Sequence, residues 1–246
     1  MKKRIIGICV AGLFCLTEAG AQSWDYKVNA GLNFGGSAPF SLPAEVREIE
    51  QYSPNAFAPH LALEAIRWIN ERWGVAAQIT WDHKGFTVRD RVKNLYTEID
   101  IEGNSGAQTG NFTGKNTTEV HNIYFTLPVM ATYRGSNRWA SQAGFYFAYL
   151  YRPVFKGQAS DGYLRRGSPI GEKINVPNAG FDFSKNQNRF DYGLIVAEEC
   201  RIYRNVALRG QLTCAFHSLF PDQFKAITFA MRNIYGTLGI SYQFSE

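Results

Sequence analysis

Hydrophobic and polar residues alternate along much of this chain. Between residues 24 and 34 the odd positions are polar or small, and the even positions are Trp24, Tyr26, Val28, Ala30, Leu32 and Phe34. A period of two is typical of a β-strand with one apolar face. The same alternation recurs seven more times. The sequence therefore predicts eight strands, at about residues 24–34, 57–69, 73–83, 119–134, 138–152, 189–203, 205–217 and 233–244.

The segments that connect these strands alternate between long and short. The long ones are Gly35–Ala56, Lys84–Thr118, Pro153–Asn188 and Ser218–Arg232, and the short ones are Asn70–Arg72, Gly135–Asn137 and the region of Arg204. Outer-membrane barrels sort their connections in this way, with short periplasmic turns and long extracellular loops. We therefore expect an eight-stranded antiparallel transmembrane β-barrel of the outer-membrane type, with both termini in the periplasm.

Residue pairing across two of the short turns supports this fold. A turn at Asn70–Arg72 places apolar residues opposite each other, such as Leu63 and Ile79. A turn at Tyr203–Asn205 does the same for Val196 and Leu212. The opposite face pairs polar residues: His60 with Asp82, Glu64 with Gln78, Glu199 with Arg209, and Asp191 with His217. A slip of one residue would destroy both patterns, because it moves every side chain to the other face.

Ionisable residues on the polar face indicate which face points inward. Such groups are costly in a soluble apolar core but pair readily inside a small membrane barrel. We expect a structural polar network that plugs the lumen, made of His60, Glu64, Asp82, Asp191, Glu199, Arg209 and His217. A narrow porin-like channel, with a proton or ion path through this network, is the alternative.

Aromatic residues gather near the two ends of the predicted strands, as in the interface girdles of membrane barrels. The end with the short turns has Trp24, Tyr26, Trp68, Trp73, Tyr133, Trp139, Tyr203, Tyr242 and Phe244. The end with the long loops has Phe34, Phe57, Trp81, Tyr149, Tyr151, Phe190 and Phe216.

The composition and the N-terminal segment indicate that the protein is exported. The 246 residues are 45% hydrophobic, yet the mean hydropathy is −0.24. The one long apolar run, Ile5–Leu16, is too short for a membrane-spanning helix. It follows the basic segment Met1–Arg4 and precedes Ala19–Ala21. This order is typical of a secretory signal peptide. We expect residues 1–21 to be cleaved, which leaves a barrel domain at 22–246.

Removal of the signal peptide changes the charge and the cysteine count. Lys and Arg fall from 26 to 23 and Asp and Glu from 21 to 20, so the formal net charge falls from +5 to +3. So small an excess, without a basic cluster, does not support nucleic-acid binding. Cys200 and Cys214 remain. The expected register puts Cys214 opposite Leu194, about 20 Å along the strand from Cys200, so we expect two free thiols.

Several motifs together resemble the Bacteroidota porin-like (PorT-type) outer-membrane β-barrel family. They are Gly31–Gly36 with Pro39 and Leu42–Arg47, Tyr124–Val129, Gly162–Gly171, and the terminal Gly239–Phe244. The resemblance covers the whole mature chain. It implies an outer-membrane barrel of eight strands, whose last strand is read by the barrel-assembly machinery. It supplies neither a catalytic residue nor a settled activity.

Candidate chemistry in the loops is sparse. His217 and Ser218 are adjacent, so on a strand they point to opposite faces and do not form a base and a nucleophile. Glu98, Asp100, Glu102 and Asn104 offer oxygen atoms for Ca²⁺, but a solvated acidic loop is the favoured interpretation. We therefore expect no enzyme, no cofactor and no metal. A lipid-modifying enzyme of the outer leaflet is the third hypothesis.

Two other loops have features of recognition. Ser41–Ser53 reads as a short helix, capped by Ser41 and opened by Pro43, with Val46 and Ile49 on one face. In the third long loop Tyr163, Arg165, Arg166 and Lys173 suit contact with lipopolysaccharide phosphates or glycans, although a basic loop without a ligand is equally open. We expect a non-enzymatic envelope protein that is structural, or that recognises an envelope protein or glycan ligand through its extracellular loops.

Overall fold

The computed structural model describes residues 23–39, 43–101, 106–227 and 229–244. It is an antiparallel all-β fold with eleven strands in one sheet. None of the helices among the described residues has both the length and the apolar character needed to cross a membrane. Residues 1–22, which include the expected signal peptide, lie outside the described residues. A single 3₁₀ turn at Ser184–Asn186 accompanies the strands in the described part of the chain.

Eight strands form a closed ring, because each is hydrogen-bonded to two neighbours and the first pairs with the last. In ring order they are β1 (Trp24–Ala38), β3 (Pro59–Trp68), β4 (Trp73–Ile101), β5 (Gln108–Arg134), β6 (Trp139–Arg152), β9 (Phe190–Tyr203), β10 (Val206–Ala215) and β11 (Arg232–Phe244). The expected count of eight is wrong for the sheet as a whole, since three further strands lie in segments expected to be loops: β2 (Val46–Pro54), β7 (Phe155–Arg165) and β8 (Lys173–Asp182).

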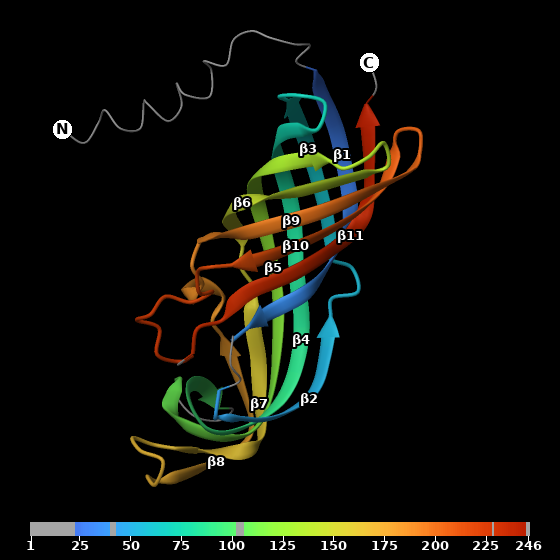
Figure 1. The fold of residues 1–246 in the computed structure, drawn as a ribbon. Coiled ribbons are helices and arrows are strands. Elements are labelled where there is room, and N and C mark those ends of the chain that lie inside the picture. Colours follow the sequence, from blue (N-terminus) through green and yellow to red (C-terminus); the bar gives the residue numbers. More distant parts are fainter. Residues whose placement is uncertain (1–22, 40–42, 102–105, 228, 245–246) are drawn as a thin grey trace, which may run out of the picture.

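The additional strands extend the fold beyond the ring. β4 and β5 stay paired far past the end of β3, out to Ile99 and Gln108. β2 and β8 pair with β4, and β7 pairs with both β5 and β8. Figure 1 shows this part at the end of the molecule opposite the two termini. We call it the distal projection: β2, β7, β8, and residues 84–101 and 108–118 of β4 and β5. Its core is apolar, with Phe112, Leu164 and Val176 fully buried.

The expected helix in the first loop is wrong, because residues 46–54 form strand β2. Beyond the end of β3, the edge of β4 offers unpaired backbone groups, and β2 satisfies them. Two register shifts, between Val46 and Glu48 and between Ile49 and Gln51, insert extra residues. They place Val46, Ile49 and Tyr52 opposite alternate residues of β4, so a helix-like spacing of three lies on one face of a strand. Ser41, the expected cap, lies outside the described residues.

The pairing predicted across the short turns is confirmed over most of both hairpins. His60 lies opposite Asp82 and Leu63 opposite Ile79, and Glu199 lies opposite Arg209. A β-bulge between Val206 and Ala207 shifts the register of the β9–β10 hairpin next to its turn. Cys214 lies opposite Leu194, as expected, and both cysteines of the described chain are free.

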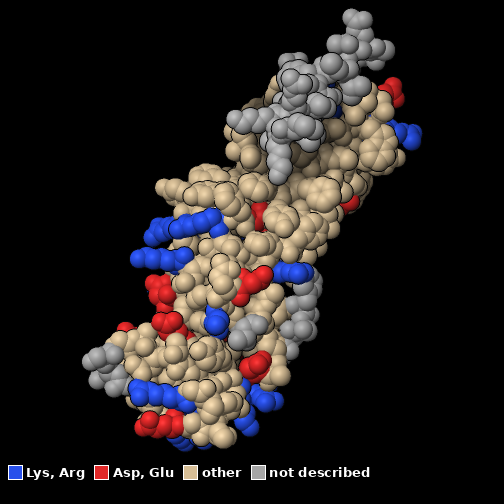
Figure 2. Space-filling view, turned by 90° about the vertical axis from the view of Figure 1, so that its left-hand side faces the viewer, with Lys and Arg blue, Asp and Glu red and all other residues tan. Residues whose placement is uncertain are grey.

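Burial alternates along every ring strand, so one face points into the ring and the other outward. The outward side chains are apolar and exposed, for example Leu63, Phe145 and Leu208. In Figure 2 most of the visible charged side chains lie over the middle and lower parts of the view, and a few lie at the upper right. The aromatic residues expected in two girdles lie on this outer surface, exposed or half-buried, except for Trp68.

The prediction that Trp68 belongs to an outer aromatic girdle is wrong. Its side chain is buried inside the ring, where its indole N–H donates to Asp25 Oδ2 at 2.7 Å. The Arg134 guanidinium lies 3.9 Å from its ring centroid. The interior also has an apolar cluster that includes Ile66 and Ile195, so it is less uniformly polar than the sequence indicated.

Candidate functional site

Ion pairs in the interior of the ring link neighbouring strands and also cross from one wall to another. Arg209 on β10 donates to Glu199 on β9 at 2.6 Å, and Lys27 on β1 lies 2.5 Å from the other oxygen of Glu199. Arg209 also lies 3.4 Å from Glu64 on β3. All four side chains are buried. A buried carboxylate needs such donors, because an unpaired charge in this environment is costly.

Amide side chains complete the partners of Glu64. Gln78 and Gln142 donate to its two oxygens at 2.5 and 2.7 Å, and Asn29 donates at 3.0 Å. These residues come from β4, β6 and β1, on different sides of the ring. The network thus links opposite walls through side chains and fills the interior at this level.

A second group of polar contacts lies nearer the distal projection. Asp82 accepts from Thr126 at 3.0 Å and lies 2.7 Å from His60 Nδ1. Asp191 accepts from Asn233 at 2.9 Å. The Lys84 ammonium lies between three tyrosine rings, with centroid distances of 5.3 Å to Tyr124, 5.6 Å to Tyr146 and 5.3 Å to Tyr235.

The structure therefore buries six of the seven residues expected in the lumen network: His60, Glu64, Asp82, Asp191, Glu199 and Arg209. His217 is the exception and a correction. β10 ends at Ala215, so His217 no longer follows the strand alternation, and its side chain is exposed. Its ring stacks on Tyr192 at 5.7 Å instead of facing Asp191.

Two basic residues of the third long loop, Arg165 and Lys173, come together at the tip of the β7–β8 hairpin, next to its connecting loop. Arg165 lies opposite Lys173 in the register of the two strands. Both cations lie over the Tyr163 ring, at 5.3 and 4.2 Å from its centroid. A hydrogen bond with Thr113 and the nearby charges of Arg165 and Lys173 lower the pKa of the Tyr163 hydroxyl. Arg166 points elsewhere and donates to Gln108 at 2.6 Å.

The acidic segment of the second loop does not form a metal site in the described chain. Glu98 pairs across the sheet with Thr109, and Asp100 lies opposite Gly180 of β8. Glu102 and Asn104 lie outside the described residues. Within the residues that the structure describes, no group of three or more His, Cys, Asp or Glu side chains is placed to hold a metal ion.

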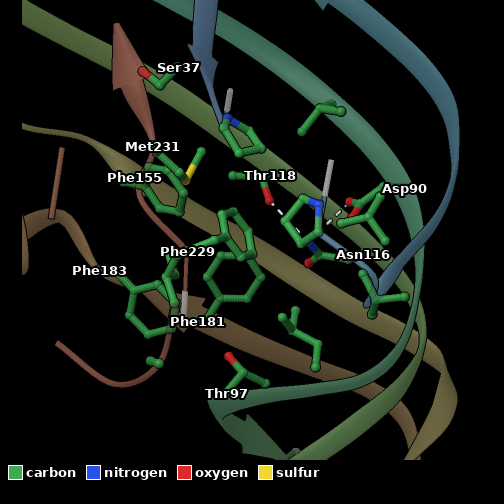
Figure 3. A pocket seen from close by; sticks show the side chains of 18 of the residues that line it. Ser37, Asp90, Thr97, Asn116, Thr118, Phe155, Phe181, Phe183, Phe229 and Met231 are labelled. Carbon is green, nitrogen blue, oxygen red and sulfur yellow. Dashed lines mark hydrogen bonds between the residues drawn. The ribbon is translucent and has the colours of Figure 1, made fainter. Parts of the chain in front are cut away.

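The distal projection has a cavity of about 410 Å³, within the usual range for small-molecule sites. We call it the outer pocket. Its wall is mainly apolar and aromatic, with Tyr52, Phe86, Phe181 and Met231 among its residues. Figure 3 shows Asp90, Asn116 and Thr118 together on one side and Phe155, Phe181 and Phe183 on another. Asn116 donates to Asp90 Oδ1 and to the Thr118 hydroxyl, both at 3.2 Å.

Burial makes the Asp90 carboxyl a weaker acid than usual. Loss of solvation raises the pKa of its carboxyl to about 6, the Asn116 hydrogen bond opposes this rise, and the charge of Glu50 adds to it. Sequence reasoning missed this site, because its wall comes from six strands (β1, β2, β4, β5, β7 and β8) and the last loop. The available signal was the alternation of Phe86, Val88, Asp90 and Val92, which continues the β4 pattern with one carboxylate on its apolar face.

Comparison with known proteins places the fold in a family. A model described as "Outer membrane protein beta-barrel domain" matches residues 20–221. The chain belongs to this outer-membrane β-barrel family. The family agrees with the closed ring and its apolar outer surface. This match is to a broad outer-membrane barrel family. It does not distinguish the Bacteroidota PorT-type group that the sequence motifs resemble. No curated protein matched the sequence.

Solved structures with a similar arrangement include two of Ail, the attachment invasion locus protein of Yersinia pestis. One is a complex with the heparin analogue sucrose octasulfate: it is 9% identical, with 91% of this chain and 99% of that chain covered and a TM-score of 0.37. The other is 12% identical, with 90% and 97% covered and a TM-score of 0.35. The CymD monoaromatic hydrocarbon channel is 9% identical, with 90% and 89% covered and a TM-score of 0.23.

Proposed function

We propose that this family member is a non-enzymatic outer-membrane protein that recognises a ligand or partner on the cell surface. The ring of eight strands crosses the membrane, its interior is closed, and the distal projection lies outside the cell. The observation that carries the proposal is the filled interior, in which Arg209 bridges Glu199 and Glu64 across the ring. A barrel of eight strands is only wide enough to hold its own side chains.

The outer surface of the ring supports the membrane location. Exposed apolar residues such as Leu127, Val129 and Leu238 would face water in a soluble protein. A continuous apolar band between aromatic residues fits the hydrocarbon layer and its two interfaces. We further propose that both termini lie in the periplasm, since they share the end with the short turns. In this scheme β11 is the strand that the barrel-assembly machinery reads, and the order of motifs supports a PorT-type relative from Bacteroidota.

The tip of the β7–β8 hairpin supports recognition of envelope components. Arg165 and Lys173 place two positive charges beside the Tyr163 ring, on the part of the molecule assigned to the outside. Basic side chains of this kind bind phosphate groups through charge-assisted hydrogen bonds. Lipopolysaccharide phosphates, or an anionic glycan, are the partners that this chemistry favours.

A narrow channel is the second candidate. His60 Nε2, Gln78 Oε1 and Asp191 Oδ1 are buried in the interior without a hydrogen-bond partner among the described residues. Buried polar atoms of this kind are usually satisfied by water, and a chain of waters is a path for protons. The enzyme hypothesis has less support, because the His217 ring stacks on Tyr192.

Conductance in planar bilayers separates the closed barrel from the channel. The purified full chain should show no stable open level above the protein-free baseline. A variant with Lys27, Glu199 and Arg209 changed to Ser and Glu64 changed to Gln removes the cross-links together, leaves no unpaired charge among the four positions, and should conduct. A stable open level in the unmodified protein would establish the channel and overturn the closed-barrel proposal.

A further inference from the structure

The outer pocket combines an apolar wall with one buried carboxylate. Asp90 lies on β4 with 8% of its surface exposed, and it points into the pocket in Figure 3. Its two neighbours on the strand, Arg89 and Arg91, are exposed on the other face. There they donate to Gln51 and Glu50 of β2, at 3.3 and 2.8 Å. The pocket side of the strand is thus acidic, although the sequence around Asp90 is basic.

The Asp90 carboxylate lacks a counter-charge. Among the described residues, no Lys or Arg forms an ion pair with it, and its side-chain hydrogen bond is the one from the neutral amide of Asn116. The other charged group that acts on it is Glu50, which is also acidic. A carboxylate in an apolar wall without a cation is costly. A ligand that brings a positive charge would recover this cost on binding.

We propose that the outer pocket binds a soluble small-molecule amine, with its ammonium group on Asp90 and an aromatic or branched apolar body among the aromatic rings. The inference rests on the proposed recognition function and names a ligand class for the distal projection. The ammonium donates to the carboxylate, and Tyr52, Phe86 and Phe181 supply ring faces that attract cations and cover the apolar body. The cavity of about 410 Å³ has room for one such molecule.

Matched probes test the charge. The full chain in phosphatidylcholine nanodiscs is titrated calorimetrically at pH 7.5 with 4-phenylbutylamine, and separately with 4-phenylbutan-1-ol, with empty nanodiscs as the blank. The amine should bind about tenfold more tightly than the alcohol, since hydrogen bonds to charged groups are the stronger ones. Asp90→Asn should remove this difference and leave the affinity for the alcohol unchanged. The control Asp222→Asn, at an exposed residue that does not line the outer pocket, should change neither.

A second variant tests the place of binding. A Cβ atom at Gly36 would lie 3.6 Å from both Phe86 and Tyr52, an ordinary contact distance. Gly36→Leu therefore extends a side chain into the aromatic side of the pocket without a backbone clash. It should weaken the binding of both probes about tenfold, by the loss of apolar contact with the ligand.

The outcomes distinguish this proposal from the recognition function. Equal affinities for amine and alcohol, unaffected by Asp90→Asn, would overturn the amine assignment. Absence of binding by both probes, or binding that is unaffected by Gly36→Leu, would overturn the outer pocket as the site. Neither result contradicts recognition at the β7–β8 hairpin, because that function is tested by the binding of envelope components. The closed barrel is tested separately, by conductance.

Discussion

Burial of Asp90 in the wall of the outer pocket ties the stability of the distal projection to pH. Its ordinary pKa is 3.8, and in the folded chain desolvation, partly opposed by Asn116, raises it to about 6. The folded state therefore binds this proton more tightly than the unfolded state does. Stability from this group is present at pH 4 and is lost as the pH rises through about 6.

The pH dependence is measurable as a difference between two proteins. The free energy of unfolding of the distal projection should fall by about 2–3 kcal/mol more between pH 4 and pH 7 in the unmodified chain than in Asp90→Asn. Urea titrations followed by proteolytic cleavage of the projection give these values. The ionisable groups that the two proteins share contribute to both profiles, so the difference reports the Asp90 carboxyl. Identical pH profiles would show that Asp90 is not held in an apolar wall.

At the scale of elements, the alternation of apolar and polar residues predicts how neighbouring strands of the ring pair. It does not predict the additional strands that pair outside the ring. The β3–β4 hairpin was predictable residue by residue, since apolar residues face apolar ones on one side and His60 meets Asp82 on the other. β2 was not predictable, because its two bulges place the residues of one face three positions apart in the sequence instead of two. Its strand conformation comes from the free edge of β4, a tertiary contact that overrides local pattern.

Other parts of the fold were missed for related reasons. β7 includes Gly157 and Gly162, and β8 includes Pro177, residues that are depleted in strands. At the candidate sites, the ion pair of Glu199 with Arg209 followed from register alone. The position of His217 did not, since it depends on where β10 ends. The outer pocket was beyond local reasoning, because its residues meet only when β1, β2, β4, β5, β7, β8 and the last loop fold together.

Close packing of β7 against β5 gives a prediction for this element. A Cβ atom at Gly157 would lie 2.0 Å from the Thr117 carbonyl oxygen and 2.5 Å from the Phe181 ring. Gly157→Val should therefore destabilise the distal projection by about 1–3 kcal/mol. The ring should stay folded, since β7 is not part of it. Limited proteolysis should cut within residues 153–188, while the heat-dependent gel mobility of the barrel is unchanged.

Gly180 in β8 provides the matched control. A Cβ atom there has no neighbour within 4 Å, so Gly180→Val should resist the protease as the unmodified protein does. Equal resistance of Gly157→Val would mean that β7 tolerates the added volume and that the close approach to β5 is not required. Loss of the barrel mobility shift in Gly157→Val would mean that the ring and the projection fold as one unit.

At the scale of the whole molecule, the difference between the two ends of the ring supports the proposed orientation in the membrane. The termini and the short turns lie at one end of the ring, and the strands of the distal projection lie at the other (Figure 1). Outer-membrane barrels keep short turns in the periplasm and elaborate the opposite end. In the orientation that we propose, the basic hairpin and the outer pocket face the external medium.

Single cysteines at the two ends test this orientation. In a chain with Cys200 and Cys214 changed to Ala, Ile170→Cys places a thiol at a residue that is 89% exposed near the hairpin tip. Asn137→Cys places one in a short turn of the ring. A membrane-impermeant maleimide should label Ile170→Cys on intact cells and Asn137→Cys only after the outer membrane is opened. Val129→Cys, in the apolar outer surface, should resist labelling in both. The reverse order of labelling would place the short turns outside and the recognition surface in the periplasm.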